Sequence, residues 1–207
     1  MATGTKIPTP QNTAFLLCDL QERFRDNIHS FESVASTARK MLRVSKVLDI
    51  PVIITEQYPK AFGPTVPEAI STQSGPIHGP FPKTKFGMKI PEVESVLNEL
   101  QGVESLVVFG IESHICVLQT TIEFIERGKN GEKPYSVYVI ADGVSSCNKE
   151  EVPIALAHMR QRGAHIVSSE SLIYTLLGDA SHPRFKEVAG IVREEKAATS
   201  SALRNLL

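Results

Sequence analysis

Cys116 occupies a position at which a thiol can become reactive. It follows the apolar run Ser105–Phe109 and lies in the first turn of a segment with helical spacing, for which Ser113 is a candidate N-cap. The unpaired amides and the dipole of a helix N-terminus stabilise a thiolate, and the same amides can hold a developing oxyanion. Because a lone helical cysteine is more often structural, this position by itself indicates only a candidate nucleophile.

Two aspartates directly follow apolar runs that are typical of buried strands. Asp19 ends the run Ala14–Cys18, and Asp142 ends the run Tyr135–Ala141. Ligands bind beyond the carboxyl ends of parallel strands, so Asp19 is a candidate for a partly desolvated general base. An aspartate in such a place can equally be a turn former, and Asp142, which precedes Gly143, is predicted to be one.

The other chemically active side chains give weaker signals. Cys18 in an apolar run and Cys147 in a Ser/Asn-rich loop are predicted to be structural, and Lys83 has the local sequence of a solvated loop lysine. The six histidines show neither H-E-x-x-H nor D-x-H spacing, so we expect no metal and no cofactor. His114, two residues before Cys116, is a candidate for the rim of a pocket.

The elements that must position these residues alternate between strand and helix. Apolar runs predict strands at 14–18, 52–54, 105–109, 135–141 and 164–167, with a further strand near 77–84. Helical spacing predicts helices over 31–48, 115–127, 150–162, 172–177 and 185–192, whereas the Gly- and Pro-rich stretch 56–89, which includes Gln73–Pro76, predicts turns. This alternation predicts an α/β fold, a three-layer α/β/α sandwich around a mostly parallel, doubly wound, Rossmann-like sheet of about six strands.

Length and composition narrow the classes of partner. We assign residues 1–207 to a single domain with a polar N-terminal extension, 1–13, and a polar C-terminal tail, 194–207, which we expect to fray or to pack on a neighbouring subunit. The net charge of -1 favours a small polar substrate or a protein partner over nucleic acid or an anionic membrane.

No apolar run approaches the ~20 residues that span a bilayer. The three scattered cysteines and the polar N-terminus predict a cytoplasmic protein, with mitochondrial import left open.

Three short motifs, in this order, resemble those of the isochorismatase-like cysteine hydrolases. Leu17–Gln21 is similar to the family's D-x-Q motif, Lys83–Phe86 to K-x-x-[YF], and Gly110–Val117 to G-(five residues)-C-V. The resemblance extends from about Ala14 to Val192 and is greatest to the isochorismatase-domain-containing branch. It implies an isochorismatase-like hydrolase fold, a small-molecule substrate and a homo-oligomer, either a dimer or a tetramer.

By this resemblance Asp19, Lys83 and Cys116 are the catalytic residues. Cys116 attacks an amide or carbamoyl carbonyl to form a thioester-type intermediate, Asp19 passes the thiol proton to the leaving amine, and Lys83 keeps both groups charged. The resemblance also implies a cis peptide bond at Ile111–Glu112, with the backbone amides of Glu112 and Cys116 as the oxyanion hole. The further pocket residues that it suggests are Gln21, Phe24, Gln57, Tyr58, Phe86, Ile111 and His114.

Two departures from the family pattern affect the expected substrate. Gly87–Lys89 replaces the Ser-Ala-Phe of many relatives, and Glu56–Tyr58 stands near the D-x-H metal site of the nicotinamidase branch, which disfavours nicotinamide. Relatives that cleave isochorismate do not need the cysteine, so Cys116 favours metal-independent hydrolysis of an amide. The alternatives are isochorismatase-type hydrolysis without covalent catalysis and a non-catalytic interaction protein that retains the fold. A nuclease is disfavoured, because the sequence has no basic patch, metal-binding carboxylate cluster or acid–base histidine pair.

Overall fold

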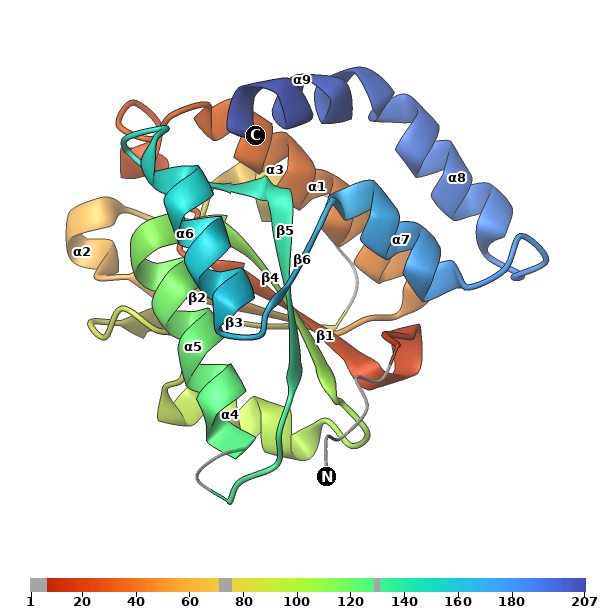
Figure 1. The fold of residues 1–207 in the computed structure, drawn as a ribbon, viewed down its shortest axis with the longest axis horizontal. Helices are drawn as coiled ribbons and strands as arrows, with labels where there is room; N and C mark the ends of the chain where they lie inside the picture. The colour runs from red at the N-terminus through yellow and green to blue at the C-terminus, as the bar shows by residue number, and fades with distance from the viewer. Residues whose placement is uncertain (1–6, 71–75, 129–130) are drawn as a thin grey trace.

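One parallel sheet forms the centre of the molecule in the computed structural model, which describes residues 7–70, 76–128 and 131–207 (Figure 1). The start of the polar N-terminal extension, 1–6, and the predicted turn residues Gln73–Gly75 lie outside the described residues. The strands are β1 (Thr13–Cys18), β2 (Val52–Gln57), β3 (Ile77–Lys83), β4 (Ser105–Ile111), β5 (Ser136–Ser145) and β6 (His165–Val167).

The strand order is that of a doubly wound sheet. The six described strands lie in the order β3-β2-β1-β4-β5-β6, and every neighbouring pair is parallel. The order of the strands reverses between β1 and β4, so a crevice can form beyond the carboxyl ends of these two strands. The predicted three-layer α/β/α fold, including the strand near 77–84, is confirmed.

Helices cover both faces of this sheet (Figure 1). One face is covered by α1 (Phe31–Leu48), α7 (Ser169–Leu177), α8 (Phe185–Glu194) and α9 (Lys196–Leu206), and the other by α4 (Pro91–Glu99), α5 (Leu118–Arg127) and α6 (Glu151–Gln161). The short helices α2 (Pro59–Phe62) and α3 (Pro67–Ile70) follow β2. None of the helices in the described part of the chain combines the length and apolar character needed to cross a membrane.

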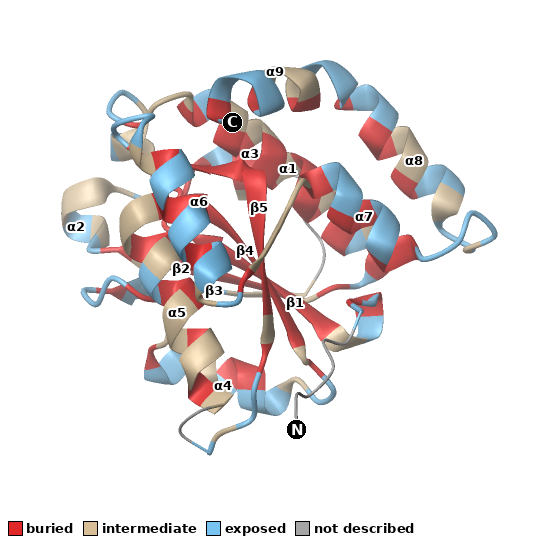
Figure 2. Ribbon diagram, viewed as in Figure 1, coloured by how far each residue is buried: buried red, intermediate tan, exposed pale blue. Residues whose placement is uncertain are grey.

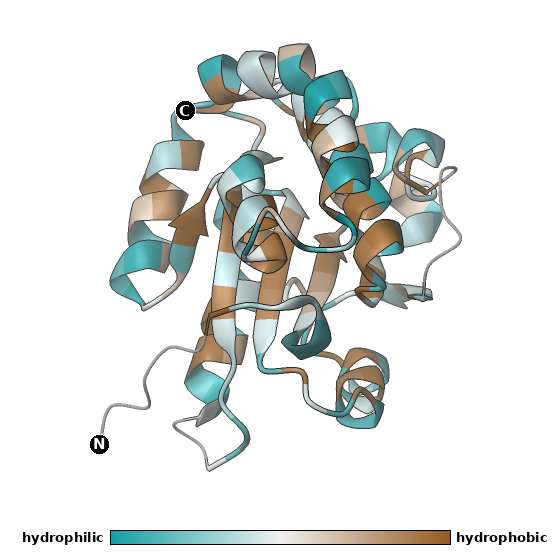
Figure 3. Ribbon diagram, turned by 90° about the vertical axis from the view of Figure 1, so that its right-hand side faces the viewer, coloured by the Kyte–Doolittle hydropathy of each residue, from teal (hydrophilic) through white to brown (hydrophobic). Residues whose placement is uncertain are grey.

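The two-sided burial of the strands explains their continuous apolar sequences. Along β1, Phe15 and Leu17 join the apolar cluster beneath α1, whereas Leu16 and Cys18 join the cluster beneath α4 and α5. Successive side chains of a strand point to opposite faces, so a strand covered on both faces needs apolar residues at every position. Figures 2 and 3 show the buried and largely hydrophobic strands between helices with exposed, hydrophilic outer surfaces.

Strand β5 is longer than predicted, and Asp142 is not a turn residue. The pairing between β4 and β5 is interrupted by a bulge and resumes with Gly110 opposite Val144. Asp142 is fully buried, accepts a hydrogen bond from the backbone N–H of Ser169 at 2.6 Å and lies 3.9 Å from the Lys40 ammonium. The prediction of a turn was wrong because these partners come from α1 and α7, which are distant in sequence.

The C-terminal segment also differs from its prediction. Instead of fraying, Lys196–Leu206 form α9, which packs on α1 of the same chain. Lys40 on α1 donates a hydrogen bond to Thr199 at 2.6 Å, and Glu195 accepts a hydrogen bond from Arg39 at 2.9 Å. Helix α4, which the sequence pattern did not predict, begins with Pro91 in its first turn, where proline is well tolerated.

Candidate active site

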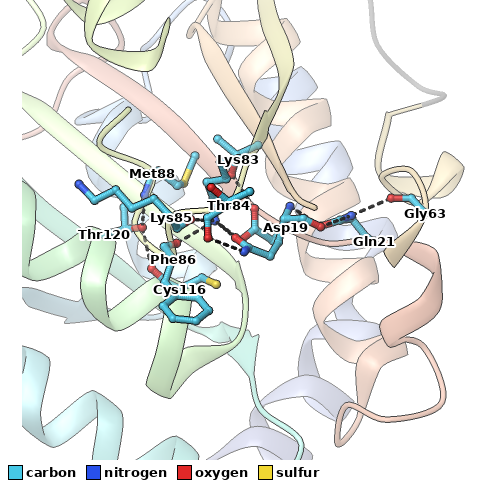
Figure 4. A network of polar contacts seen from close by, with 12 residues as sticks. Asp19, Gln21, Gly63, Lys83, Thr84, Lys85, Phe86, Met88, Cys116 and Thr120 are labelled. Atoms are coloured by element: carbon cyan, nitrogen blue, oxygen red, sulfur yellow. Dashed lines mark hydrogen bonds and ion pairs between the residues drawn. The ribbon is translucent and has the colours of Figure 1, made fainter. Parts of the chain in front are cut away.

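Asp19 and Lys83 form a buried ion pair at the carboxyl edge of the sheet. Asp19 directly follows β1 in a left-handed backbone conformation, with φ of 47°, which aspartate tolerates better than most residues. Lys83 ends β3, and its Nζ donates a hydrogen bond to Asp19 Oδ2 at 2.6 Å (Figure 4). The other carboxylate oxygen of Asp19 accepts a hydrogen bond from the Thr55 hydroxyl at 2.8 Å. Both oxygens of Asp19 are therefore held in place.

The environment of Lys83 keeps its side chain charged. Its ammonium also contacts the side-chain oxygen of Gln57 at 2.7 Å and the carbonyl of Phe86 at 2.8 Å. Burial alone would lower the pKa of Lys83, but the neighbouring acidic groups of Cys18, Asp19 and Cys116 outweigh burial and raise it. The local sequence pattern of a solvated loop lysine was thus misleading, because Lys83 is a buried residue at the end of a strand.

Cys116 lies on a π-helical turn and not in the first turn of an α-helix. This turn, η3 (Ser113–Val117), leads directly into α5, and π-helical turns are often found at functional sites. Glu112 occupies the N-cap position, so the predicted N-cap role of Ser113 was wrong. The side chain of Ser113 instead forms a hydrogen bond with Ser146 at 2.5 Å. The peptide bond Ile111–Glu112 is cis, as the resemblance implies.

The backbone of Cys116 is joined to the loop that follows Lys83. The hydroxyl of Thr120 donates to the carbonyl of Cys116 at 2.6 Å and accepts a hydrogen bond from the backbone N–H of Met88 at 2.9 Å (Figure 4). Each of these three residues is buried. One hydroxyl therefore fixes the distance between the turn that bears the thiol and the loop after β3.

A cavity of about 220 Å³ contains both Asp19 and Cys116. Its lining residues are Asp19, Phe24, Gln57, Phe62, Phe86, Ile111, Glu112, Ile115 and Cys116. Aromatic and aliphatic side chains predominate, and the rings of Phe24 and Phe62 are stacked with centroids 4.6 Å apart. The cavity thus combines a thiol and a carboxylate with apolar walls, which suits a small ligand that carries one polar group.

The structure separates the suggested pocket residues into two groups. Phe24, Gln57, Phe86 and Ile111 line the cavity, whereas Gln21, Tyr58 and His114 do not appear among its lining residues. The side-chain amide of Gln21 instead forms hydrogen bonds with the backbone of Gln57 and Gly63. Tyr58 lines a separate groove with Lys60 and Lys85. His114 contacts the hydroxyl of Ser146.

Two lining residues were missed by the sequence analysis. Phe62 lies in the turn-rich stretch, where no periodic pattern marks a buried side. Ile115 directly precedes Cys116 in the motif Gly110–Val117, and this adjacency was the one signal that could have identified it.

The other two cysteines have raised thiol pKa values. Burial raises the pKa of Cys18, and the neighbouring Cys116 thiol and Asp19 carboxylate raise it further. Partial burial and the neighbouring Glu112 carboxylate raise the pKa of the Cys147 thiol. Both thiols are therefore protonated at neutral pH and are poor nucleophiles.

One group of side chains in the described part of the chain could hold a metal ion. It consists of Glu112, His114 and Cys147, whose ligand atoms all lie within 4.8 Å of one another. No local spacing pattern marks this group in the sequence, because Glu112 and His114 lie at the start of the η3 turn and Cys147 follows about thirty residues later. The expectation of no metal rested on the absence of such a pattern.

The parallel sheet and the cavity at its carboxyl edge define an α/β protein with a doubly wound, Rossmann-like fold. The family model of the isochorismatase domain matches residues 13–171. The chain belongs to the isochorismatase family.

Relatives in this family are similar over most of the chain. Isochorismatase domain-containing protein 1 of Salmo salar is 41% identical over 184 residues, which cover 89% of this chain and 62% of that protein. The chain therefore spans about three fifths of the length of this relative. Isochorismatase domain-containing protein 2 of Xenopus laevis is also 41% identical over 184 residues, which cover 89% of this chain and 85% of the relative.

Solved structures share the fold. The structure of the MAR1 ribonuclease from Caenorhabditis elegans is 40% identical, with a TM-score of 0.82, and the match covers 91% of this chain and 93% of that chain. The Escherichia coli YcaC gene product, described as an octameric hydrolase of unknown specificity, has a TM-score of 0.80, with 98% of this chain and 97% of that chain covered. Its identity is only 17%, so it shows a common fold and no more.

Proposed function

We propose that this protein is a metal-independent cysteine hydrolase that cleaves the C–N bond of a small amide or carbamoyl compound. The observation that carries the proposal is the cavity shared by Cys116 and Asp19, in which the Asp19 carboxylate is hydrogen-bonded to Lys83. A thiol beside a held carboxylate is the arrangement needed for an activated nucleophile. The family membership supports a hydrolase in general.

The proposed reaction follows from these positions. Asp19 accepts the thiol proton, and the Cys116 thiolate attacks the carbonyl carbon of the substrate. The backbone amides of Glu112 and Cys116 hold the oxyanion that forms. Asp19 then gives the proton to the departing amine, which leaves a thioester on Cys116. Asp19 next deprotonates a water molecule, whose oxygen attacks the thioester. Collapse of the resulting intermediate breaks the C–S bond and releases the acid, and Asp19 returns the proton to the Cys116 thiolate.

Lys83 has an electrostatic role in this proposal. Its ammonium stabilises the Asp19 carboxylate in the free protein and the thiolate during attack, because it remains protonated throughout. The ion pair lies away from water, where a charge–charge interaction is stronger than at the surface.

The apolar walls favour a neutral substrate. Among the cavity-lining residues the charged side chains are the acidic residues Asp19 and Glu112, and the nearby Lys83 is already paired with Asp19. A substrate carboxylate would be buried without a free cation, which is costly. This disfavours the runner-up function, the hydrolysis of isochorismate without covalent catalysis, because isochorismate is a dicarboxylate.

Ribonuclease activity is a second candidate function, because the 40% identical structure from Caenorhabditis elegans carries that name. Cleavage of RNA would require a surface that binds the phosphate backbone, and the net charge of -1 offers no general attraction for it. We also propose a homo-oligomer in the cytoplasm; the octameric YcaC product is a precedent for assembly of this fold.

The deciding experiment is a screen of small neutral amides, ureido acids and a labelled single-stranded RNA. Wild-type protein is compared with Cys116→Ala and with Asp179→Asn, which changes an exposed loop carboxylate as a control. We expect turnover of a neutral amide that depends on Cys116. Cysteine-independent RNA cleavage without amide turnover would contradict the proposal.

Iodoacetamide distinguishes an enzyme from an interaction protein that retains the fold. At near-neutral pH, alkylation of Cys116 should be faster than alkylation of a free thiol if Asp19 assists its ionisation. Asp19→Asn should slow this reaction. Equal rates for wild type, Asp19→Asn and free cysteine would favour the interaction protein.

A further inference from the structure

Three side chains of types that bind metal ions lie close together beside the cavity that contains Cys116. Glu112 and His114 flank the beginning of the η3 turn, and Cys147 follows β5. Their ligand atoms lie within 4.8 Å of one another, and Glu112 also lines the cavity. Two separate segments, joined by the pairing of β4 with β5, thus bring a carboxylate, an imidazole and a thiol together.

Hydrogen bonds hold two of the three ligands in place. The backbone N–H of Cys147 donates to Glu112 Oε2 at 2.8 Å, and the ring atom His114 Nδ1 is 2.8 Å from the hydroxyl of Ser146. Ser146 is itself hydrogen-bonded to Ser113. Such contacts to groups outside the ligand set orient the ligands of metal sites and fix the imidazole ring.

The chemical types of the ligands select the metal. Nitrogen and sulfur ligands with one carboxylate suit Zn²⁺, whereas Mg²⁺ and Ca²⁺ prefer oxygen ligands alone. In tetrahedral Zn²⁺ sites neighbouring ligand atoms lie roughly 3.5 Å apart. The three ligand atoms would therefore need to approach one another by about 1 Å, which rotation of the partly exposed side chains allows.

The charges of the group also favour a cation. The Glu112 carboxylate lies within 4.8 Å of the Cys147 thiol. A divalent cation that binds Cys147 displaces the thiol proton to solvent, so two of the three ligands of the bound ion are anions.

We propose that Glu112, His114 and Cys147 form a Zn²⁺ site with three protein ligands and one position open to water or another small ligand. A three-ligand set is typical of zinc sites that exchange a ligand and differs from a closed structural site. The ion takes no part in the proposed amide hydrolysis, because Asp19, Lys83 and Cys116 are not among its ligands. The site shares Glu112 with the proposed oxyanion hole, but it uses the carboxylate and not the backbone amide. An ion bound there would lie beside the cavity wall formed by Glu112.

Titration of the metal-free protein with Co²⁺ tests the site, because cobalt bound to a thiolate gives a charge-transfer absorption band. We expect one equivalent of Co²⁺, displaced by Zn²⁺, in wild type and in Cys116→Ser. We expect Cys147→Ser to lose the band, His114→Ala to bind Co²⁺ more weakly, and Ser146→Ala to weaken binding about 10-fold while it keeps the band. Circular dichroism establishes that each variant is folded.

Two results would overturn the site. The first is a band that persists in Cys147→Ser and disappears in Cys116→Ser, because the metal would then be bound by the other thiol. The second is a wild-type protein that shows no band at stoichiometric Co²⁺.

Discussion

Lys83 and Asp19 are 64 positions apart in the sequence and form a 2.6 Å hydrogen-bonded ion pair with both side chains excluded from water. The pair connects the end of edge strand β3 to the end of β1, across the intervening strand β2. This contact fixes the position of the carboxylate in the cavity that also contains Cys116. The proposed chemistry and the stability of the protein therefore depend on the same contact.

Cys116→Ala should reduce turnover of the best amide substrate to the background of the assay, because no other group can form the thioester. Cys116→Ser should be almost as damaging, since a hydroxyl is much harder to deprotonate than a thiol. Steady-state kinetics measure the loss, and circular dichroism checks that the fold is kept. If folded Cys116→Ala retained most of the activity, catalysis by addition of water would replace the covalent mechanism.

Asp19→Asn keeps the shape of the side chain and removes the base, so kcat should fall by ~10²-fold or more. KM should change much less, because Asp19 is assigned to proton transfer and not to binding. Asp179→Asn, which changes a carboxylate in an exposed loop, is the matched control. A rise in KM with kcat unchanged would instead assign Asp19 to substrate binding.

Lys83→Ala should lower the free energy of unfolding by about 3–5 kcal/mol, because it leaves the Asp19 carboxylate buried without its partner. Lys196→Ala, at an exposed position of α9, should change it by less than about 0.5 kcal/mol. Urea denaturation at pH 7 measures both. Equal free energies of unfolding for the two variants would show that water stabilises the Asp19 carboxylate as well as the Lys83 ammonium does.

The pH dependence of this loss follows from the raised pKa of Lys83. The group is charged in both states below the pKa of an unfolded lysine, about 10.4, so its stabilisation is complete there. As the pH rises through the higher pKa of the folded state, the stabilisation is lost. The difference in unfolding free energy between wild type and Lys83→Ala should thus be constant from pH 7 to about pH 10 and decrease at higher pH. A decrease already at pH 8 would mean that burial, which lowers the pKa of Lys83, outweighs the neighbouring acidic groups, which raise it.

Gly110→Ala should destabilise the protein by more than the 1–3 kcal/mol that is typical of an overpacked core. Gly110 has φ of 120°, and a Cβ at this position would lie 2.1 Å from the backbone carbonyl oxygen of Cys18. Gly190→Ala is the control, because its Cβ would meet nothing within 4 Å and alanine favours the helix α8. In thermal denaturation, Gly110→Ala should lower the Tm and Gly190→Ala should raise it. An unchanged Tm for Gly110→Ala would mean that β1 and β4 can move apart to accommodate the added methyl group.

Phe62→Ala should raise KM for a neutral amide with an apolar group and leave kcat nearly unchanged. Phe62 stacks on Phe24 in the cavity wall and takes no part in the bond-making steps of the proposed mechanism. Phe62→Leu, which preserves apolar volume, should recover part of the affinity. A large fall in kcat for both variants would indicate that this wall also aligns the carbonyl.

The buried strands were predictable because each carries its own signal. The runs that became β1 and β4 are apolar at every position, and this pattern follows directly from burial on both faces of a parallel sheet. Asp19 could also be found, since it directly follows such a run. The position of Lys83 could not be derived locally, because its burial depends on the loop after β3 and on Asp19.

The features that escaped prediction have two causes, which are contacts between distant segments and elements too short or too irregular to show a clear period. Asp142 looks like a turn residue until α7 supplies the N–H of Ser169, and the η3 turn differs from an α-helix although its sequence has helical spacing. Phe62 belongs to a four-residue helix, α2, too short to have a periodic pattern. Sequence periodicity reports which face of an element is buried, and it carries no information on which partner covers that face.

Helices α8 and α9 determine how the chain can be shortened or fused. The match to the family model ends at residue 171, yet Ile191 and Ala202 belong to the same buried apolar cluster as α1. Lys40, only 1% exposed, is also covered by α9. In a fragment that ended at residue 171, the apolar surface beneath α8 and α9 and the Lys40 side chain would be exposed to water. We therefore expect this fragment to aggregate. The smallest stable fragment is thus longer than the segment that defines the family, and an affinity tag is best attached beyond Leu206.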